Sequence, residues 1–235
     1  MGVFRRLLYA ALCAGLLSGI VATAAHQIGT VPLILKAETY EQKVTPPPTD
    51  AHSQTPAAPH AAGAAAWEPE NGIERTAYTL AADLLTAIGF ALLLVSGLAL
   101  RGGAIDWRDG LFWGLAGFAA FTIAPGLGLP PEIPGTEAAP LLGRQLWWLA
   151  TTVSTGAGLA LLAFTRRAPA AALALLLIVL PHLYGAPLPA EHAAAAPEVL
   201  AHQFVVAVTV TSLLFWAALG ASTGYFYRRF APQRS

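Results

Sequence analysis

The chain has 235 residues, of which 56% are hydrophobic and only 11% are charged. Soluble domains carry about 25% charged residues, so this composition excludes an ordinary soluble protein. The formal net charge is zero, which argues against nucleic acid as a partner. A single cysteine, Cys13, excludes an intrachain disulfide and a cysteine-based metal site.

Long apolar segments dominate the chain, and each is close to the ~20 residues that a helix needs to cross a bilayer. The fifth is the shortest, but Arg166 and Arg167 precede it as a tight turn, and Pro169 suits the first turn of a helix. We therefore predict an all-α, polytopic membrane bundle of about six transmembrane helices, forming a single membrane domain over residues 1–235. The predicted helices are residues 4–29, 77–100, 110–128, 145–165, 168–184 and 197–221.

The first segment has a second interpretation, a secretory signal peptide. Arg5 and Arg6 precede its apolar stretch, and residues 22–24 (Ala-Thr-Ala) are similar to a cleavage site. The stretch is, however, longer than the ~7–15 residues of a signal core. Gly15 and Gly19 also form a GxxxG pattern, which is typical of helix contacts in membranes. These features favour a retained transmembrane helix.

The loops differ in length between the two sides of the membrane. Residues 30–76 form a long outer loop, in which residues 32–42 favour an interfacial helix. Residues 43–70 are rich in proline and alanine and predict a flexible tether. The prolines of residues 129–135 impose extended or turn structure on the next outer loop.

Lysine and arginine positions predict the orientation. With six spans, nine of these residues fall on one side and four on the other, and the richer side faces the cytoplasm. We therefore expect a multi-pass protein of the bacterial inner membrane with both termini in the cytoplasm.

Histidines and carboxylates cluster on the opposite, outer side. Imidazole and carboxylate groups bind divalent transition metals. Loop length does not explain three histidines that stand at the ends of apolar segments, and Asp83 lies well inside the second segment, where an ionisable residue is a functional candidate. Glu198 lies one turn before His202 and shares its helical face. The predicted metal ligands are His26, His182, His202, Asp83, Glu198 and His192.

Plainer interpretations of these residues stay open. The histidines could be interfacial side chains that bond to water or backbone, and Glu198 could be a first-turn acid favoured by the helix dipole. Asp83 could pair with Arg75 or Arg144. Small and hydroxyl residues in the later segments more often hold helices together than line a path. These residues are Gly110, Gly114, Thr151, Thr152, Ser154, Thr155, Gly220 and Gly224.

Two functions other than transport fit parts of the pattern. Ser154 in the fourth segment and His202 in the sixth are similar to the arrangement of rhomboid intramembrane serine proteases, which use a Ser–His dyad. The Gly-x-Ser signature is missing, because Thr152 stands two residues before Ser154. A non-transporting membrane scaffold or metal-sensing subunit also agrees with the sequence.

A series of short motifs keeps its order along the whole chain. The motifs are Phe4-Arg5-Arg6-Leu7-Leu8, Ala25-His26-Gln27 with Val31-Pro32-Leu33-Ile34, Leu129-Pro130-Pro131-Glu132-Ile133-Pro134-Gly135, Arg144-Gln145-Leu146-Trp147-Trp148-Leu149 and Pro181-His182-Leu183-Tyr184-Gly185-Ala186-Pro187. Together they resemble the predicted cobalt-transporter A subunits of bacteria. The positions that lie within matching motifs are His26, Glu132, Arg144 and His182.

The resemblance implies a membrane subunit of a cobalt uptake transporter, linked with cobalamin synthesis and not an enzyme. It implies a small single-span B subunit with a histidine-rich end as the partner, beside the lipid bilayer. Cobalt(II) is the expected transported ion, no covalent cofactor is expected, and homo-oligomer formation is left open. We expect the outer-face histidines and carboxylates to capture the ion.

Overall fold

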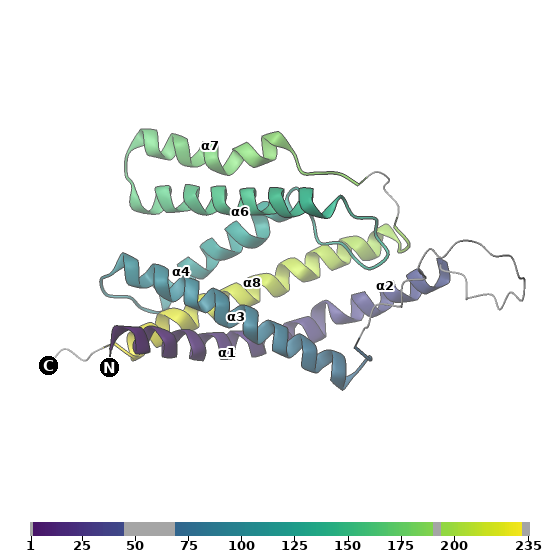
Figure 1. The fold of residues 1–235 in the computed structure, drawn as a ribbon, viewed down its shortest axis with the longest axis horizontal. Coiled ribbons are helices and arrows are strands. Elements are labelled where there is room, and N and C mark those ends of the chain that lie inside the picture. The colour runs from purple at the N-terminus through teal and green to yellow at the C-terminus, as the bar shows by residue number, and fades with distance from the viewer. Residues whose placement is uncertain (1, 45–68, 190–193, 232–235) are drawn as a thin grey trace, which may run out of the picture.

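The computed structural model describes residues 2–44, 69–189 and 194–231, and within these segments it contains helices and no β-strand. Figure 1 shows these helices in a broad arrangement, with the α6–α7 pair along one edge. The prediction of an all-α fold is confirmed for the described residues. The helices are α1 (Val3–Gly29), α2 (Val31–Val44), α3 (Ile73–Arg101), α4 (Trp107–Phe118), the π-helix η1 (Ala119–Ile123), α5 (Ala124–Gly126), α6 (Leu141–Phe164), α7 (Ala168–Tyr184) and α8 (Glu198–Arg229).

Four of the helices in the described residues are long and apolar enough to cross a membrane, namely α1, α3, α6 and α8. The apolar α7 is shorter, at 17 residues. The predicted third span, 110–128, corresponds to α4, η1 and α5, which follow one another without a break. The chain is a multi-pass membrane protein, and the count of six spans stays a prediction.

The π-helix η1 has a cause in the sequence. Pro125 has no N–H, so it cannot donate to the carbonyl of Phe121 four residues earlier, and its ring crowds that carbonyl. The turn before Pro125 is the widened one, and the Ala124 N–H donates to the carbonyl of Ala119. Turns of this kind occur mostly as single interruptions of α-helices, frequently at functional sites.

The close contact between α1 and α3 depends on glycines. A methyl group built on Gly15 would lie 2.7 Å from the Cα atom of Ile88, and one built on Gly19 would lie 2.9 Å from the Cα atom of Leu84. Both distances are too short for any side chain, so glycine permits the approach of the two backbones. The prediction that this GxxxG pattern joins helices is confirmed.

Glycines also join α4 to α8. A methyl group on Gly114 would collide with the carbonyl of Trp216, and one on Gly110 would collide with the carbonyl of Gly220. Gly224 lies in the same way against the carbonyl of Asp106. The predicted role of these glycines in helix contact is therefore confirmed. At the same end of the bundle, the Arg6 guanidinium donates to the carbonyl of Tyr227 at 3.1 Å.

The pair of α6 and α7 forms an antiparallel hairpin. Gly158 lies against the carbonyl of Ala174 and the side chain of Ile178. Near the far end of the pair, the indole N–H of Trp147 donates to the carbonyl of Pro181 at 3.1 Å. Helix α7 packs mainly on α6 and lies at the edge of the structure opposite α1 (Figure 1).

Helix α2 extends the direction of α1 and confirms that residues 32–42 are helical. Its Ala37 is fully buried in a small cluster with Ile133 of the outer loop and residues at the start of α8, among them Leu200 and Phe204. Most of the predicted tether, residues 45–68, lies outside the described residues.

Candidate transport site

The three predicted histidine ligands stand on three different helices. His26 lies near the end of α1, His182 near the end of α7 and His202 in the second turn of α8. Helices α1 and α7 are at opposite edges of the structure (Figure 1). Within the described residues, no group of three or more His, Cys, Asp or Glu side chains could hold a metal. The structure does not gather these histidines, and the shared capture site stays a prediction. His192 lies outside the described residues.

His182 has a neighbour that the sequence did not suggest. Its ring meets that of Trp147 edge to face, with ring centroids 5.8 Å apart. Because the same tryptophan donates to the carbonyl of Pro181, it contacts two consecutive residues of α7, one by a hydrogen bond and one by its ring. In this structure His182 therefore contributes to the seam between α6 and α7.

Asp83 of α3 forms a hydrogen bond with α1. Its carboxylate Oδ2 accepts a hydrogen bond of 2.8 Å from the hydroxyl of Thr23 on α1, and that hydroxyl also lies 3.0 Å from the carbonyl of Gly19. The alternative pairing of Asp83 with arginine is not what the structure shows. Arg75 pairs with Glu38 at 2.9 Å, and Arg144 pairs with Glu132 at 3.1 Å. Asp83 thus links α1 to α3.

Glu198 and His202 lie on one face of α8, as their spacing predicts, and both are exposed. That face forms a shallow surface lined by α8 residues alone.

The protease alternative requires a hydrogen bond between Ser154 and His202. The Ser154 hydroxyl donates to the carbonyl of Thr151 at 3.2 Å. The structure therefore gives no Ser–His dyad between Ser154 and His202, and the rhomboid-like alternative loses its support.

A cavity of about 800 Å³ lies between the 122–132 segment, α6 and α8, and we call it the outer cavity after the side that the predicted topology gives it. The Glu132–Arg144 ion pair lines it, and each of these two side chains is about one third exposed, at 29% and 33%. Four further polar side chains line the cavity. These are Thr122, Gln145, Thr209 and Ser212. The cavity therefore offers one carboxylate, one guanidinium and several neutral oxygen atoms to an ion.

Four of the five motifs of the sequence resemblance contact one another beside this cavity, whereas the first, residues 4–8, packs against the end of α8 through Arg6. Glu132 and Arg144 join two of the motifs directly, and Trp147 joins the second of these to Pro181. Leu33 and Ile34 of α2 pack against the cluster that contains Ile133. Each motif alone is short, and only the fold brings these four together at one end of the molecule. The sequence pointed to Glu132 and Arg144, but it did not indicate that they pair.

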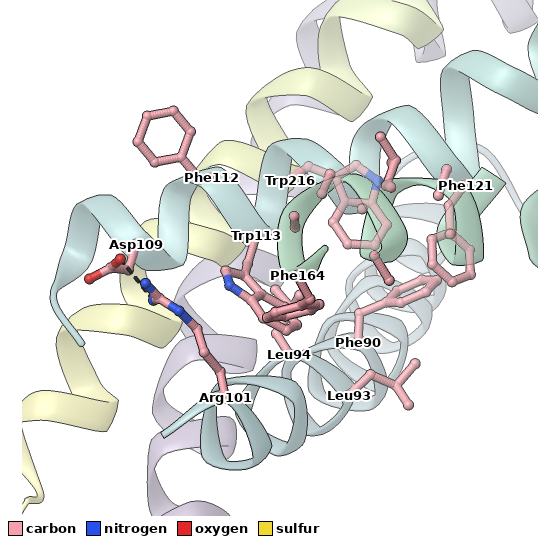
Figure 2. Close-up of a pocket in the computed structure, with 17 residues that line it drawn as sticks. Phe90, Leu93, Leu94, Arg101, Asp109, Phe112, Trp113, Phe121, Phe164 and Trp216 are labelled. Atoms are coloured by element: carbon pink, nitrogen blue, oxygen red, sulfur yellow. Dashed lines mark hydrogen bonds and ion pairs between the residues drawn. The ribbon is translucent and has the colours of Figure 1, made fainter. Parts of the chain in front are cut away.

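A second cavity, of about 460 Å³, lies between α3, α4, η1 and α6, and we call it the inner cavity after the side that the predicted topology gives it. Figure 2 shows its aromatic lining and, at one end, Arg101 paired with Asp109. The Arg101–Asp109 distance is 2.8 Å. The pKa of the Asp109 carboxyl is lowered, first by the backbone N–H of Asp106 and then by Arg101, because both donate to the carboxylate. No motif in the sequence indicated this cavity.

An all-helical chain with several apolar helices that are long enough to cross a membrane belongs to the class of multi-pass membrane proteins. The model of the family described as "Probable cobalt transporter subunit (CbtA)" matches residues 4–228. The chain belongs to this family, whose description is that of a transporter subunit and implies a partner subunit. Comparison with curated proteins and with solved structures finds no match.

Proposed function

We propose that this chain is the membrane subunit of a cobalt(II) uptake transporter and that the outer cavity receives the ion. The observation that carries the proposal is the Glu132–Arg144 pair. It joins two motifs of a cobalt-transporter family and lines a cavity of about 800 Å³. The proposed topology has six spans and both termini in the cytoplasm of a bacterium, with the protein in the inner membrane.

The chemistry of the cavity agrees with a partly hydrated divalent cation. Moving a bare ion into hydrocarbon costs tens of kcal/mol, so the ion needs water or ligands along its route. Glu132 supplies an anionic oxygen, while Arg144 repels the cation as long as the two side chains are paired. Binding of cobalt to Glu132 would therefore separate the pair and free the Arg144 side chain. A potential of 100 mV would favour inward movement by ~4.6 kcal/mol, twice the value of ~2.3 for one charge.

The structure does not bring the other predicted ligands together in one site. We propose that each contacts the ion separately as it moves to the cavity. Glu198 and His202 present an exposed carboxylate and imidazole on one α8 face. His26, Asp83, His182 and His192 are proposed as weaker or later contacts. The B subunit with its histidine-rich end would deliver further imidazoles to this side.

The test is uptake of radioactive cobalt by cells that lack their other cobalt importers and express this chain with its partner. Glu132→Gln should abolish most of the uptake, and Glu137→Gln, which changes an exposed acid of the same loop, should leave it unchanged. Protein amount in the membrane is measured for both variants. Equal uptake by Glu132→Gln and the unmodified chain would contradict the role of the outer cavity.

A further experiment addresses the histidines and the scaffold alternative. Joint replacement of His26, His182 and His202 by alanine should reduce uptake if they contribute ligands, and unchanged uptake removes them from the proposal. Liposomes that contain the chain with its partner should accumulate cobalt. A partner that transports equally well without the chain would support the scaffold or sensing function.

A further inference from the structure

The outer and inner cavities follow one face of the same helix. On α6, Gln145 and Leu149 line the outer cavity, while Gly156 and Ala160 line the inner one. These positions recur at intervals of four or seven residues, so they share one side of the helix. On the opposite wall, the segment from Asp109 to Glu132 likewise passes from one cavity to the other. The two cavities are therefore successive parts of one gap beside α6.

Phe121 stands at the boundary, because it lines both cavities. Its ring stacks on that of Trp216 at 5.5 Å between centroids, and it contacts Trp148 at 6.0 Å and Phe90 at 5.0 Å. Rings from η1, α6, α8 and α3 thus meet at this level. Figure 2 shows Phe121, Phe90 and Trp216 at the end of the inner cavity opposite the Arg101–Asp109 pair.

A buried hydroxyl lies at the same level of α6. Thr152 is one turn from Trp148, which lines the outer cavity, and one turn from Gly156, which lines the inner one, so it lies between them on the shared face of α6 without lining either cavity. It is only 5% exposed, and its hydroxyl has no hydrogen-bond partner within the described residues. A buried hydroxyl without a partner is unfavourable, and polar groups of this kind are rare unless water or an ion reaches them.

We infer that the two cavities are halves of one hydrated passage for a divalent cation, closed in this structure by Phe121 with Trp148 and Trp216. The inference rests on the proposed function, since it names the route that the ion takes after the outer cavity. Apolar constrictions close channels by excluding water, and an aromatic ring on the π-turn η1 provides such a constriction. An ion pair stands near each end, Glu132–Arg144 and Arg101–Asp109.

The passage is tested by the accessibility of single cysteines to a membrane-impermeant thiol reagent. Cys13 is the only cysteine of the chain, so Cys13→Ala gives a clean background. Thr122→Cys then reports on the outer cavity, and Ala116→Cys on the inner one. Sealed vesicles of both orientations are treated from one side at a time. The two positions should react from opposite sides of the membrane.

Opening the barrier should remove this sidedness. In the Phe121→Ala background, Ala116→Cys should become reactive from the side that labels Thr122→Cys, at a comparable rate. Trp148→Ala, from the other wall, should act in the same way and replaces Phe121→Ala if that variant does not fold. Phe112→Ala is the matched control, because Phe112 lines the inner cavity, is 70% exposed and points away from the other rings (Figure 2).

The inference is overturned if Thr122→Cys and Ala116→Cys react from the same side while Phe121 and Trp148 are unchanged. It is also overturned if neither Phe121→Ala nor Trp148→Ala makes Ala116→Cys reactive from the side that labels Thr122→Cys. It is equally overturned if Phe112→Ala has the same effect as Phe121→Ala. Labelling needs no cobalt. If the labelling results contradict the barrier, the uptake assay of Glu132→Gln still decides the proposed function. Conversely, if the two positions are labelled from opposite sides but the protein takes up no cobalt, the passage is supported and cobalt is rejected as its solute.

Discussion

The helices around α1 and α8 are packed differently from the α6–α7 hairpin. Among α1, α3, α4 and α8, glycines bring backbones into direct contact, as Gly15 does at Ile88 and Gly114 at Trp216. Hydroxyl groups add polar links, such as Ser18 to Ser222 at 3.3 Å. The hairpin has one close glycine contact of its own, at Gly158, but the face that α6 turns toward the other helices lines two cavities.

This difference separates a rigid part from an adjustable one. Backbone contacts leave no space for side chains to rearrange, because interiors at this density respond to added volume by strain. A helix that borders cavities can shift without breaking such contacts. We expect movement during transport to occur between the hairpin and the rest, and four substitutions test how far the two regions differ.

The largest effect is expected for Gly114→Ala. The new methyl group would collide with the carbonyl of Trp216 and meet Gly220, and neither is a flexible side chain. We expect a loss of about 3 kcal/mol in the free energy of unfolding, the upper end for overpacking. Gly156→Ala is the matched control, since a methyl group there meets no atom within 4 Å. Thermal unfolding in detergent measures both, and an equal loss in the two variants would contradict the comparison.

A smaller loss is expected when Thr23 is changed to valine. The variant keeps the shape of the side chain but removes the donor to Asp83, which leaves a carboxylate between α1 and α3 without that bond. We expect about 1–2 kcal/mol less stability. Thr23→Ser, which retains the hydroxyl, should recover most of the difference in the same unfolding assay. If valine and serine behave alike, the hydrogen bond does not contribute.

Within the hairpin, Trp147→Phe should lower the free energy of unfolding by about 1 kcal/mol. Phenylalanine keeps an aromatic ring beside His182 but cannot donate to the carbonyl of Pro181. Because the hairpin is the adjustable part, hydrogen exchange should quicken in α7 and remain unchanged in α1. Faster exchange throughout the protein would indicate that the two regions unfold together.

The smallest effect is expected at the inner ion pair. Asp109→Asn removes the charge that pairs with the half-exposed Arg101, and exposed pairs contribute at most about 1 kcal/mol. The pKa of Asp109 is lowered in the folded protein, so its contribution exists above the ordinary value of ~3.9 and disappears as the pH falls through the lower, folded value. Unfolding curves of both proteins should therefore differ at pH 7 and converge in strong acid. A constant difference would exclude the carboxylate as the cause.

The sequence predicted most of the helices because apolar runs of this length have few other uses. It also predicted the contacts of Gly15, Gly19 and the glycines of α4 and α8, since small residues at a spacing of four permit close helices. The π-turn was missed, although Pro125 one turn after Phe121 was its signal. The last helix continues beyond the predicted span 197–221 to Arg229, through the polar residues Ser222, Thr223 and Tyr227.

The site was harder to predict than the helices. Glu132 and Arg144 were found through short motifs, and their pairing needed the fold to bring the outer loop back to α6. The histidine site was argued from depth in the membrane alone. Equal depth does not make neighbours of residues on helices at opposite edges, as His26 and His182 show. Which helices are adjacent is decided by packing, which hydropathy does not encode.

The length of α8 has a consequence for the surrounding lipid. Its 32 residues extend about 48 Å, at ~1.5 Å per residue. Even at a steep tilt of ~40°, such a helix spans about 37 Å along the bilayer normal, whereas the hydrocarbon is ~30 Å thick. Even at that tilt, between one and two turns must therefore stand in the headgroup layers, with Glu198 at one end of the helix and Arg229 at the other. Hydrophobic mismatch would then couple the angle of α8 to bilayer thickness, so acyl-chain length becomes a variable in any reconstitution of this protein.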